Sequence, residues 1–180
     1  MPTVFTHAVV PLAACIALGS RRIGPRLLVA GVLVAMLPDA DVVALKLGIA
    51  YADALGHRGA SHSLLFASVI GLIGALAHRT LRAPAWLAAL WLFACTASHP
   101  LLDALTNGGL GVALLWPWSD ARHFAPWQPI QVSPIGTGFF SARGLAVLRS
   151  EMLWVWLPAA AIAFTGFALR RNAAPVSSAP

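Results

Sequence analysis

The chain has 180 residues, of which 59% are hydrophobic and only 10% are charged. Its mean hydropathy of +0.79 is too apolar for a soluble domain of this length, so the composition excludes a soluble enzyme and indicates one integral membrane domain. The net charge of +6 does not indicate a nucleic-acid partner, because the arginines lie in short clusters between apolar runs, as membrane topology requires.

Apolar runs predict the helices. Each run is expected to be α-helical, because a bilayer offers no partner for unpaired backbone groups. The runs cover residues 4–18, 27–37, 64–77, 85–105 and 152–169. The first three are shorter than the ~20 residues of a full span, so flanking residues should extend them. We therefore predict an all-α, polytopic bundle of about five transmembrane helices over residues 1–170, with a disordered tail at 171–180.

Clusters of arginine predict the orientation of these helices. Every second connection is basic, which places all three basic connections on the cytoplasmic side. These clusters are Arg21, Arg22 and Arg26; Arg79 and Arg82; and Arg170 and Arg171. The N-terminus is then outside and the C-terminus cytoplasmic. Connections 38–63 and 107–150 lie on the outer face, and the second contains tryptophans interleaved with proline, as in a segment at the membrane interface.

Ionisable side chains gather near the outer ends of several predicted helices. His7, Asp39, His62 and His99 belong to four different segments of the chain. A rise of about 1.5 Å per helical residue places each of them roughly 20–25 Å above the inner basic belt. Ionisable groups at that depth are costly unless they are paired or bound to a metal. The sequence therefore predicts one polar layer at the outer face.

The residue types in this layer are those of a metal site. Imidazole and carboxylate together suit Zn²⁺, with Mn²⁺ and Fe²⁺ as alternatives. His99 and Asp103 are four residues apart and share a helix face, although Pro100 between them could kink the helix or start a new one. Asp39 and Asp41 follow a proline, so both could face the site from a helix end or turn. Taken singly, each residue has an ordinary interpretation as a cap or an interfacial side chain.

The start of the third predicted helix, HRGASHS at residues 57–63, combines several of these features. Ser61 is expected to cap the helix that begins near His62. Arg58 is expected at the edge of the layer, where its guanidinium and the bare N–H groups of the helix would hold an anion.

The motifs TH at 6–7, LPDAD at 37–41, HRGASHS at 57–63 and HPLLD at 99–103 resemble the YdjM/YbcI-like family of bacterial inner-membrane proteins, which are described as predicted metal-dependent hydrolases. The resemblance covers about residues 5–160. It implies a metal site that draws on His7, Asp39, His57, His62, His99 and Asp103, with Arg58 beside them. Glu151 also matches, without an implied role. A weaker similarity, in the order of His and Asp residues, is to helical zinc phospholipases C and P1-type nucleases.

The leading hypothesis is a multi-pass hydrolase of the bacterial inner membrane, with its site facing the periplasm. A metal-activated water would attack an ester, with Arg58 holding an anionic group. One of Asp39, Asp41 and Asp103 would ligate the metal, and another, for which we choose Asp41, would take the proton. A site at the lipid surface favours a phosphoester of a lipid-linked or amphiphilic substrate.

Two alternatives are not enzymes. One is a structural or regulatory membrane protein whose helices are stapled by a metal. The other is a small metal or proton carrier, which a one-sided polar layer favours less, because a carrier needs polar groups through the whole membrane depth.

Overall fold

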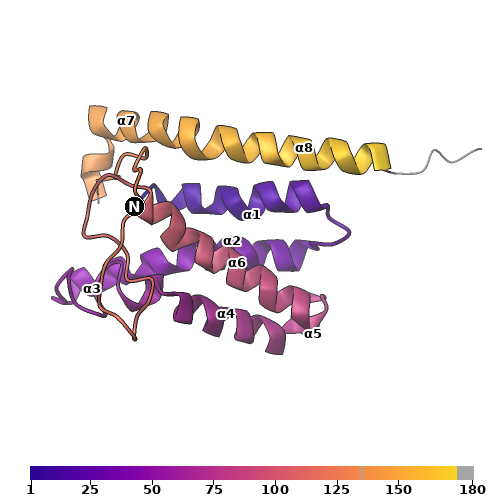
Figure 1. Ribbon diagram of the computed structural model, residues 1–180, viewed down its shortest axis with the longest axis horizontal. Helices are drawn as coiled ribbons and strands as arrows, with labels where there is room; N and C mark the ends of the chain where they lie inside the picture. The colour runs from indigo at the N-terminus through magenta and orange to yellow at the C-terminus, as the bar shows by residue number, and fades with distance from the viewer. Residues whose placement is uncertain (135, 174–180) are drawn as a thin grey trace, which may run out of the picture.

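The computed structural model describes residues 1–134 and 136–173, and in this part of the chain it contains helices and two isolated β-bridges but no strand. Five long helices form the body (Figure 1). They are α1 (Val4–Leu18), α2 (Pro25–Met36), α4 (Leu64–Leu76), α6 (Ala85–Ala104) and α8 (Leu157–Ala173). The all-α prediction is confirmed, and α1 has the predicted bounds.

The helices lie side by side in the order α8, α1, α2, α6, α4, with each packed against the next. Small residues let the backbones approach closely, as is common between helices in membranes. A Cβ at Gly74 of α4 would lie only 2.8 Å from the carbonyl oxygen of Ala88 in α6. A Cβ at Gly31 of α2 would lie 2.3 Å from Nε1 of Trp91, which donates a hydrogen bond to the carbonyl of Leu27. These contacts hold the helices that carry the site in a rigid bundle.

Three helical segments are long and apolar enough to cross a membrane: Pro25–Lys46, Ala85–Ala104 and Ala142–Ala173. Val4–Leu18 and Leu64–Leu76 are apolar but shorter. The first long segment continues from α2 through the 3-10 helix η1 (Leu37–Asp41) into α3 (Val42–Lys46). A bundle of about five membrane helices agrees with these lengths if the two short helices rely on their neighbours.

The last long segment differs from the predicted one. Residues 142–150, which we assigned to the outer connection, are helical in α7 (Ala142–Glu151). A single π turn, η4 (Met152–Trp156), joins α7 to α8 and makes one rod of 32 residues. The rod ends at Ala173, and residues 174–180 of the predicted tail lie outside the described residues.

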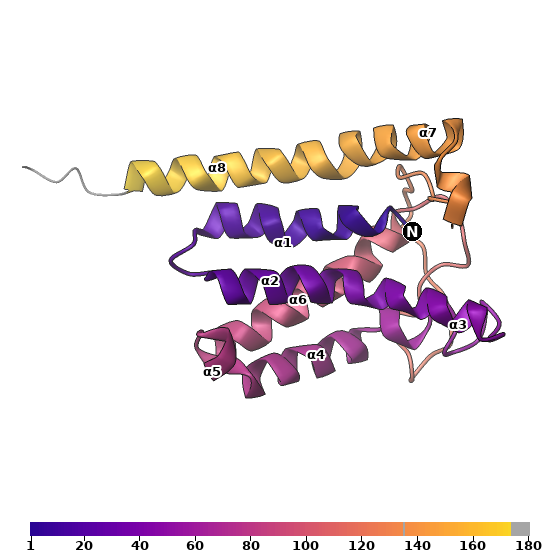
Figure 2. The same ribbon diagram turned by 180° about the vertical axis from the view of Figure 1, so that it is seen from behind.

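The connection between α1 and α2, the short helix α5 (His78–Leu81) and the end of α8 meet at one end of the bundle (Figure 2). Two arginines there donate hydrogen bonds to backbone carbonyls of neighbouring helices. Arg26 reaches the carbonyl of Thr80, and Arg170 reaches those of Ile16 and Ala17. The basic connections thus share one end, opposite to α3 and α7.

This arrangement leads to a topology prediction. Reporter fusions after Arg22, Arg82 and Arg171 should all give a cytoplasmic signal, because basic connections are retained on that side. A fusion after Asp53, in the opposite end of the bundle, serves as the control and should report the exterior. A periplasmic signal from any of the first three would overturn the orientation.

Candidate metal centre

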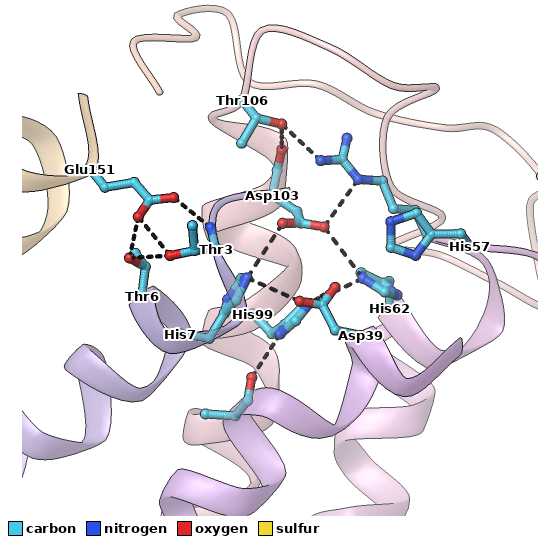
Figure 3. Close-up of polar contacts among 12 residues, drawn as sticks. Thr3, Thr6, His7, Asp39, His57, His62, His99, Asp103, Thr106 and Glu151 are labelled. Carbon is cyan, nitrogen blue, oxygen red and sulfur yellow. Dashed lines mark hydrogen bonds and ion pairs between the residues drawn. The ribbon is translucent and has the colours of Figure 1, made fainter. Parts of the chain in front are cut away.

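Five histidine and aspartate side chains from separate parts of the chain converge at the end of the bundle opposite to the arginine clusters (Figure 3). His7 comes from α1, Asp39 from η1, His62 from the 3-10 helix η2 (Ala60–His62), and His99 and Asp103 from α6. Asp39 is 6% exposed and the other four are 0% exposed. Such ionisable groups are rarely buried without a strong partner.

The distances between these side chains close a ring. Nε2 of His99 lies 3.1 Å from Nε2 of His62 and 3.3 Å from Oδ1 of Asp39. Nε2 of His62 lies 3.4 Å from Oδ2 of Asp103. Nε2 of His7 lies 3.6 Å from Oδ1 of Asp103 and 3.8 Å from Oδ2 of Asp39. Ligands held 2.0–2.1 Å from a tetrahedral zinc ion would be roughly 3.3–3.4 Å apart, so the ring has the dimensions of a coordination shell.

The hydrogen bonding of the ring fits a metal ion. Among the described residues, both ring nitrogens of His7 and all four carboxylate oxygens of Asp39 and Asp103 are buried without a hydrogen-bond partner. Buried polar atoms are almost always paired, so an unpaired cluster indicates a bound group. One ligand atom from each of Asp39, His62, His99 and Asp103 lies within 4.8 Å of the others. His7 closes the ring on the opposite oxygens of the two carboxylates.

Partners behind the ring set the tautomers of two histidines. Nδ1 of His99 lies 2.7 Å from the carbonyl oxygen of Ala35, so it must carry the hydrogen, and Nε2 keeps its lone pair. Nδ1 of His62 lies 3.1 Å from Oδ2 of Asp41, which fixes the same tautomer. A histidine that ligates a metal is commonly held in this way, by a carbonyl or carboxylate on its other nitrogen.

The carboxylates around His62 also favour a cation. Burial opposes protonation of this imidazole, but its contacts with Asp103 and Asp41 outweigh burial and raise the pKa of His62 to about 9. The negative potential that holds this proton is equally available to a divalent ion, which would displace it.

Asp39 and Asp41 point to different sides of His62. A 3-10 helix has three residues per turn, so positions two apart cannot share a face. Asp39 joins the ring, whereas Asp41 accepts hydrogen bonds from the Ser61 hydroxyl at 2.6 Å and the Arg58 N–H at 3.1 Å. The expectation that both carboxylates face one site is therefore corrected: Asp41 supports His62 from behind.

His57 lies in a neighbouring group. Its Nδ1 contacts Oδ1 of Asp41 at 2.5 Å, and its ring meets the edge of Tyr51. Asp41, His57 and His62 form a second cluster with the spacing of metal ligands. The structure thus brings five of the six predicted ligands into the ring and places His57 beside it.

Arg58 occupies an unexpected position. It is 0% exposed and adopts a left-handed backbone conformation with φ of +64°, which is uncommon for a residue other than glycine. Its Nε lies 3.1 Å from Oδ2 of Asp103, and its other nitrogens donate to Gly108 O and Thr106 Oγ1, both at 2.9 Å. Gly109 leaves room for it, since a Cβ there would lie 2.9 Å from the guanidinium. Instead of lying at the edge with a free guanidinium, Arg58 holds Asp103.

The helix start after HRGASHS is also corrected. Ser63, and not Ser61, caps α4, because its hydroxyl accepts the Phe66 N–H at 3.0 Å. Ser61 donates to Asp41 instead. The predicted kink or break at Pro100 does not interrupt α6, which presents His99 and Asp103 on one face as the four-residue spacing requires.

Several supporting residues carry no signal in the sequence. Arg122 donates to the backbone carbonyls of Tyr51, Asp53 and His57 and so holds the loop that leads to Arg58. Thr106 accepts from Arg58 while donating to the carbonyl of Asp103. Their roles depend on contacts between distant segments, and no local motif marks them.

Comparison with known proteins identifies the family of this chain. The family described as YdjM inner membrane protein matches residues 1–173. The chain belongs to the YdjM family. The inner membrane protein YbcI of Escherichia coli (strain K12) is 52% identical over 162 residues, which cover 88% of this chain and 92% of that protein. No solved structure matches the chain. Membership in the YdjM family confirms the resemblance predicted from the motifs.

The position of Arg58 leads to a prediction that differs from an anion clamp. Arg58→Ala should lower the free energy of unfolding by about 3–5 kcal/mol and weaken metal binding, because it leaves the buried Asp103 without its partner. Thermal unfolding in detergent and metal content would be measured, with the exposed Arg143→Ala as the control. A stable, metal-loaded Arg58→Ala protein that has lost only turnover would restore the clamp predicted from the sequence.

Proposed function

We propose that this member of the YdjM family is a metal-dependent hydrolase embedded in the inner membrane, acting on a phosphoester of a lipid-like or amphiphilic substrate. The observation that carries the proposal is the closed ring of buried histidines and carboxylates, in which the nitrogens of His7 and the oxygens of Asp39 and Asp103 lack hydrogen-bond partners among the described residues. The match to a family of inner membrane proteins and the three long apolar helices support the location.

The ring offers ligands for one ion, for which zinc is the first choice and Mn²⁺ or Fe²⁺ the alternatives. His62, His99, Asp39 and Asp103 would hold it, and His7 would complete the set. A divalent ion in this position supplies Lewis acidity and lowers the pKa of water towards ~7. Arg58 keeps Asp103 oriented, and the contacts of His62 and His99 with Asp41 and Ala35 keep their Nε2 atoms turned inward.

Asp41 is the acidic side chain that we expect to take up a proton. It lies outside the ring, so its carboxylate is not needed as a ligand, and its side chain is 9% exposed. Its contacts with His57 and His62 join it to the ring on one side and to the outer loop on the other. Because His62 lies between Asp41 and the other members of the ring, a proton would reach Asp41 through an intervening water and not through the His62 imidazole.

Two apolar cavities support a substrate with a hydrocarbon chain. One, of about 450 Å³, lies between α1 and α2 and reaches Asp39, with Val4, Leu33 and Met36 in its wall. The other, of about 420 Å³, runs along α4 and reaches Asp41 and Ser61. The first cavity joins a ring carboxylate to an apolar surface and the second joins Asp41 to one, so an amphiphile could bring its polar group beside Asp39 or Asp41 while its chain stays in an apolar environment.

The metal-stapled alternative is favoured by one observation. His7, His62, His99 and Asp103 are all fully buried, as ligands of a closed structural site would be. In that case the ion would stabilise the junction of α1, α2 and α6 without any turnover. A carrier is favoured less, because the ring lies at one end of the bundle.

Metal analysis tests the ring directly. The purified protein should hold a divalent ion, and His62→Ala and His99→Ala should each lower its content strongly, since each removes an inward-facing nitrogen. His123→Ala, in an exposed part of the outer loop, should leave the content unchanged. Full occupancy in both ring variants would mean that the ligand set is wrong.

Turnover separates the enzyme from the staple. In detergent micelles at saturating zinc, the wild-type protein should hydrolyse a long-chain alkyl phosphate faster than a water-soluble aryl phosphate. Asp41→Asn should reduce this rate by about 10²–10⁴-fold, which is the range expected for loss of a general base. A metal-loaded protein that is inert on both substrates, and that loses stability when the ion is removed, would favour the staple.

A further inference from the structure

Glu151 is a buried carboxylate outside the metal ring, and it connects the α7–α8 rod to the start of α1. It is 1% exposed and lies where α7 passes into the π turn η4. Oε1 accepts a hydrogen bond from the Thr3 N–H, and Oε2 accepts from the hydroxyls of Thr3 and Thr6, both at 2.7 Å (Figure 3). All three donors belong to the first turn of α1 or the residue before it. Glu151 therefore holds the start of the helix that carries His7.

The π turn explains how two side chains of the α7–α8 rod can both contact Thr6. In an α-helix, residues five apart differ by about 140° around the axis, at 100° per residue. In η4 the Leu157 N–H bonds to the carbonyl of Met152, five residues back, which turns residues five apart towards one face. Trp156 and Glu151 are five apart, and Trp156 Nε1 donates to the same Thr6 hydroxyl at 2.8 Å. The π turn thus aims both side chains at Thr6.

His7 depends on this anchoring more than the other histidines of the ring do. Among the described residues, neither of its ring nitrogens has a hydrogen-bond partner, whereas His62 and His99 are each held from behind. Its ring is otherwise placed by stacking on His99, with centroids 3.6 Å apart. The position of His7 is therefore set by the helix that carries it, and Thr6 is the preceding residue.

We propose that Glu151, together with the π turn that follows it, is the positioning residue of His7. It holds the first turn of α1 against the α7–α8 rod and so fixes the distance of the His7 imidazole from Asp39 and Asp103. This inference rests on the proposed metal centre. The inner end of the same helix pair has its own anchor, because Arg170 binds the carbonyls of Ile16 and Ala17. Loss of Glu151 would release the outer end of α1 and leave the inner end in place.

The positioning role is tested by measuring the effect of Glu151→Ala on metal affinity in the wild-type protein and in a His7→Ala protein. Zinc affinity, measured by competition with a chelator, should fall about 10–100-fold in Glu151→Ala, the range seen when partners behind metal ligands are removed. The absorption spectrum of the cobalt-substituted protein should change with it. The same substitution in a His7→Ala protein should cause little further loss, because the effect passes through His7.

The neighbouring residue provides a matched control. Ser150 is also buried in the same turn of α7, but its hydroxyl holds the Gln131 N–H of the outer loop and not α1. Ser150→Ala should therefore leave zinc affinity and the cobalt spectrum unchanged. Thr6→Val should reproduce the effect of Glu151→Ala, and Thr6→Ser, which keeps the hydroxyl, should not. This pair decides the question if Glu151→Ala does not fold.

Each result has a definite meaning. Equal zinc affinity in the wild type, Glu151→Ala and Thr6→Val would overturn the positioning role and leave the proposed metal centre standing. An equal loss of affinity in the wild-type and His7→Ala backgrounds would show that Glu151 supports the whole fold and not His7, which also overturns it. A wild-type protein that binds none of zinc, cobalt, manganese and iron would overturn the proposed function, and the positioning role with it.

Discussion

The half of this protein that lies opposite to the arginine clusters is organised around the burial of several ionisable side chains in an apolar helical bundle. Among the described residues, none of the carboxylate oxygens of Asp39 and Asp103 has a hydrogen-bond partner. Two buried carboxylates are costly because burial removes their hydration, and the Arg58 guanidinium beside Asp103 compensates for only one of them. The proposed cation would relieve this cost, since it would bind the free oxygens and offset their charge. A need for such an ion would explain why several distant segments of the chain meet at this level.

The supporting residues follow from the same constraint. Arg58 places a guanidinium beside Asp103, Asp41 lies behind His62, and the carbonyl of Ala35 lies behind His99. Arg58 fixes the orientation of Asp103, and Asp41 and the carbonyl of Ala35 fix the tautomers of His62 and His99. Arg58 does so from a left-handed backbone conformation, which is costly for arginine and is retained where the surroundings require the side chain. The Arg58 guanidinium has the chemistry of a substrate-binding group, yet its burial gives it a positioning role.

The two ends of the bundle are specialised in different ways. One end carries the arginine clusters, and two of these arginines close helix ends by binding backbone carbonyls. The opposite end carries the ring, the apolar cavities beside Asp39 and Asp41, and the loop that Arg122 holds in place. Between the two ends, small residues let α4 and α2 pack closely against α6, so the helices below the ring are in tight contact. A rigid base of this kind suits a site whose ligands come from four parts of the chain.

The sequence by itself determined the fold class, the places of the long helices and the level at which the polar residues meet. Apolar runs have the length of helices in lipid, basic clusters mark one side, and helical rise converts spacing into depth, all of which are local properties. It also identified His7, Asp39, His62, His99 and Asp103, because histidine and aspartate at that depth need a common partner. Only the tertiary structure decided which way the other side chains point. Asp41 lies behind His62 because η1 is a 3-10 helix, Arg58 is buried because the loop folds over it, and Glu151 reaches Thr6 because η4 is a π turn. These directions depend on changes in helical pitch and on contacts between residues that are between 21 and 145 positions apart in the chain, and no local pattern of residues encodes them.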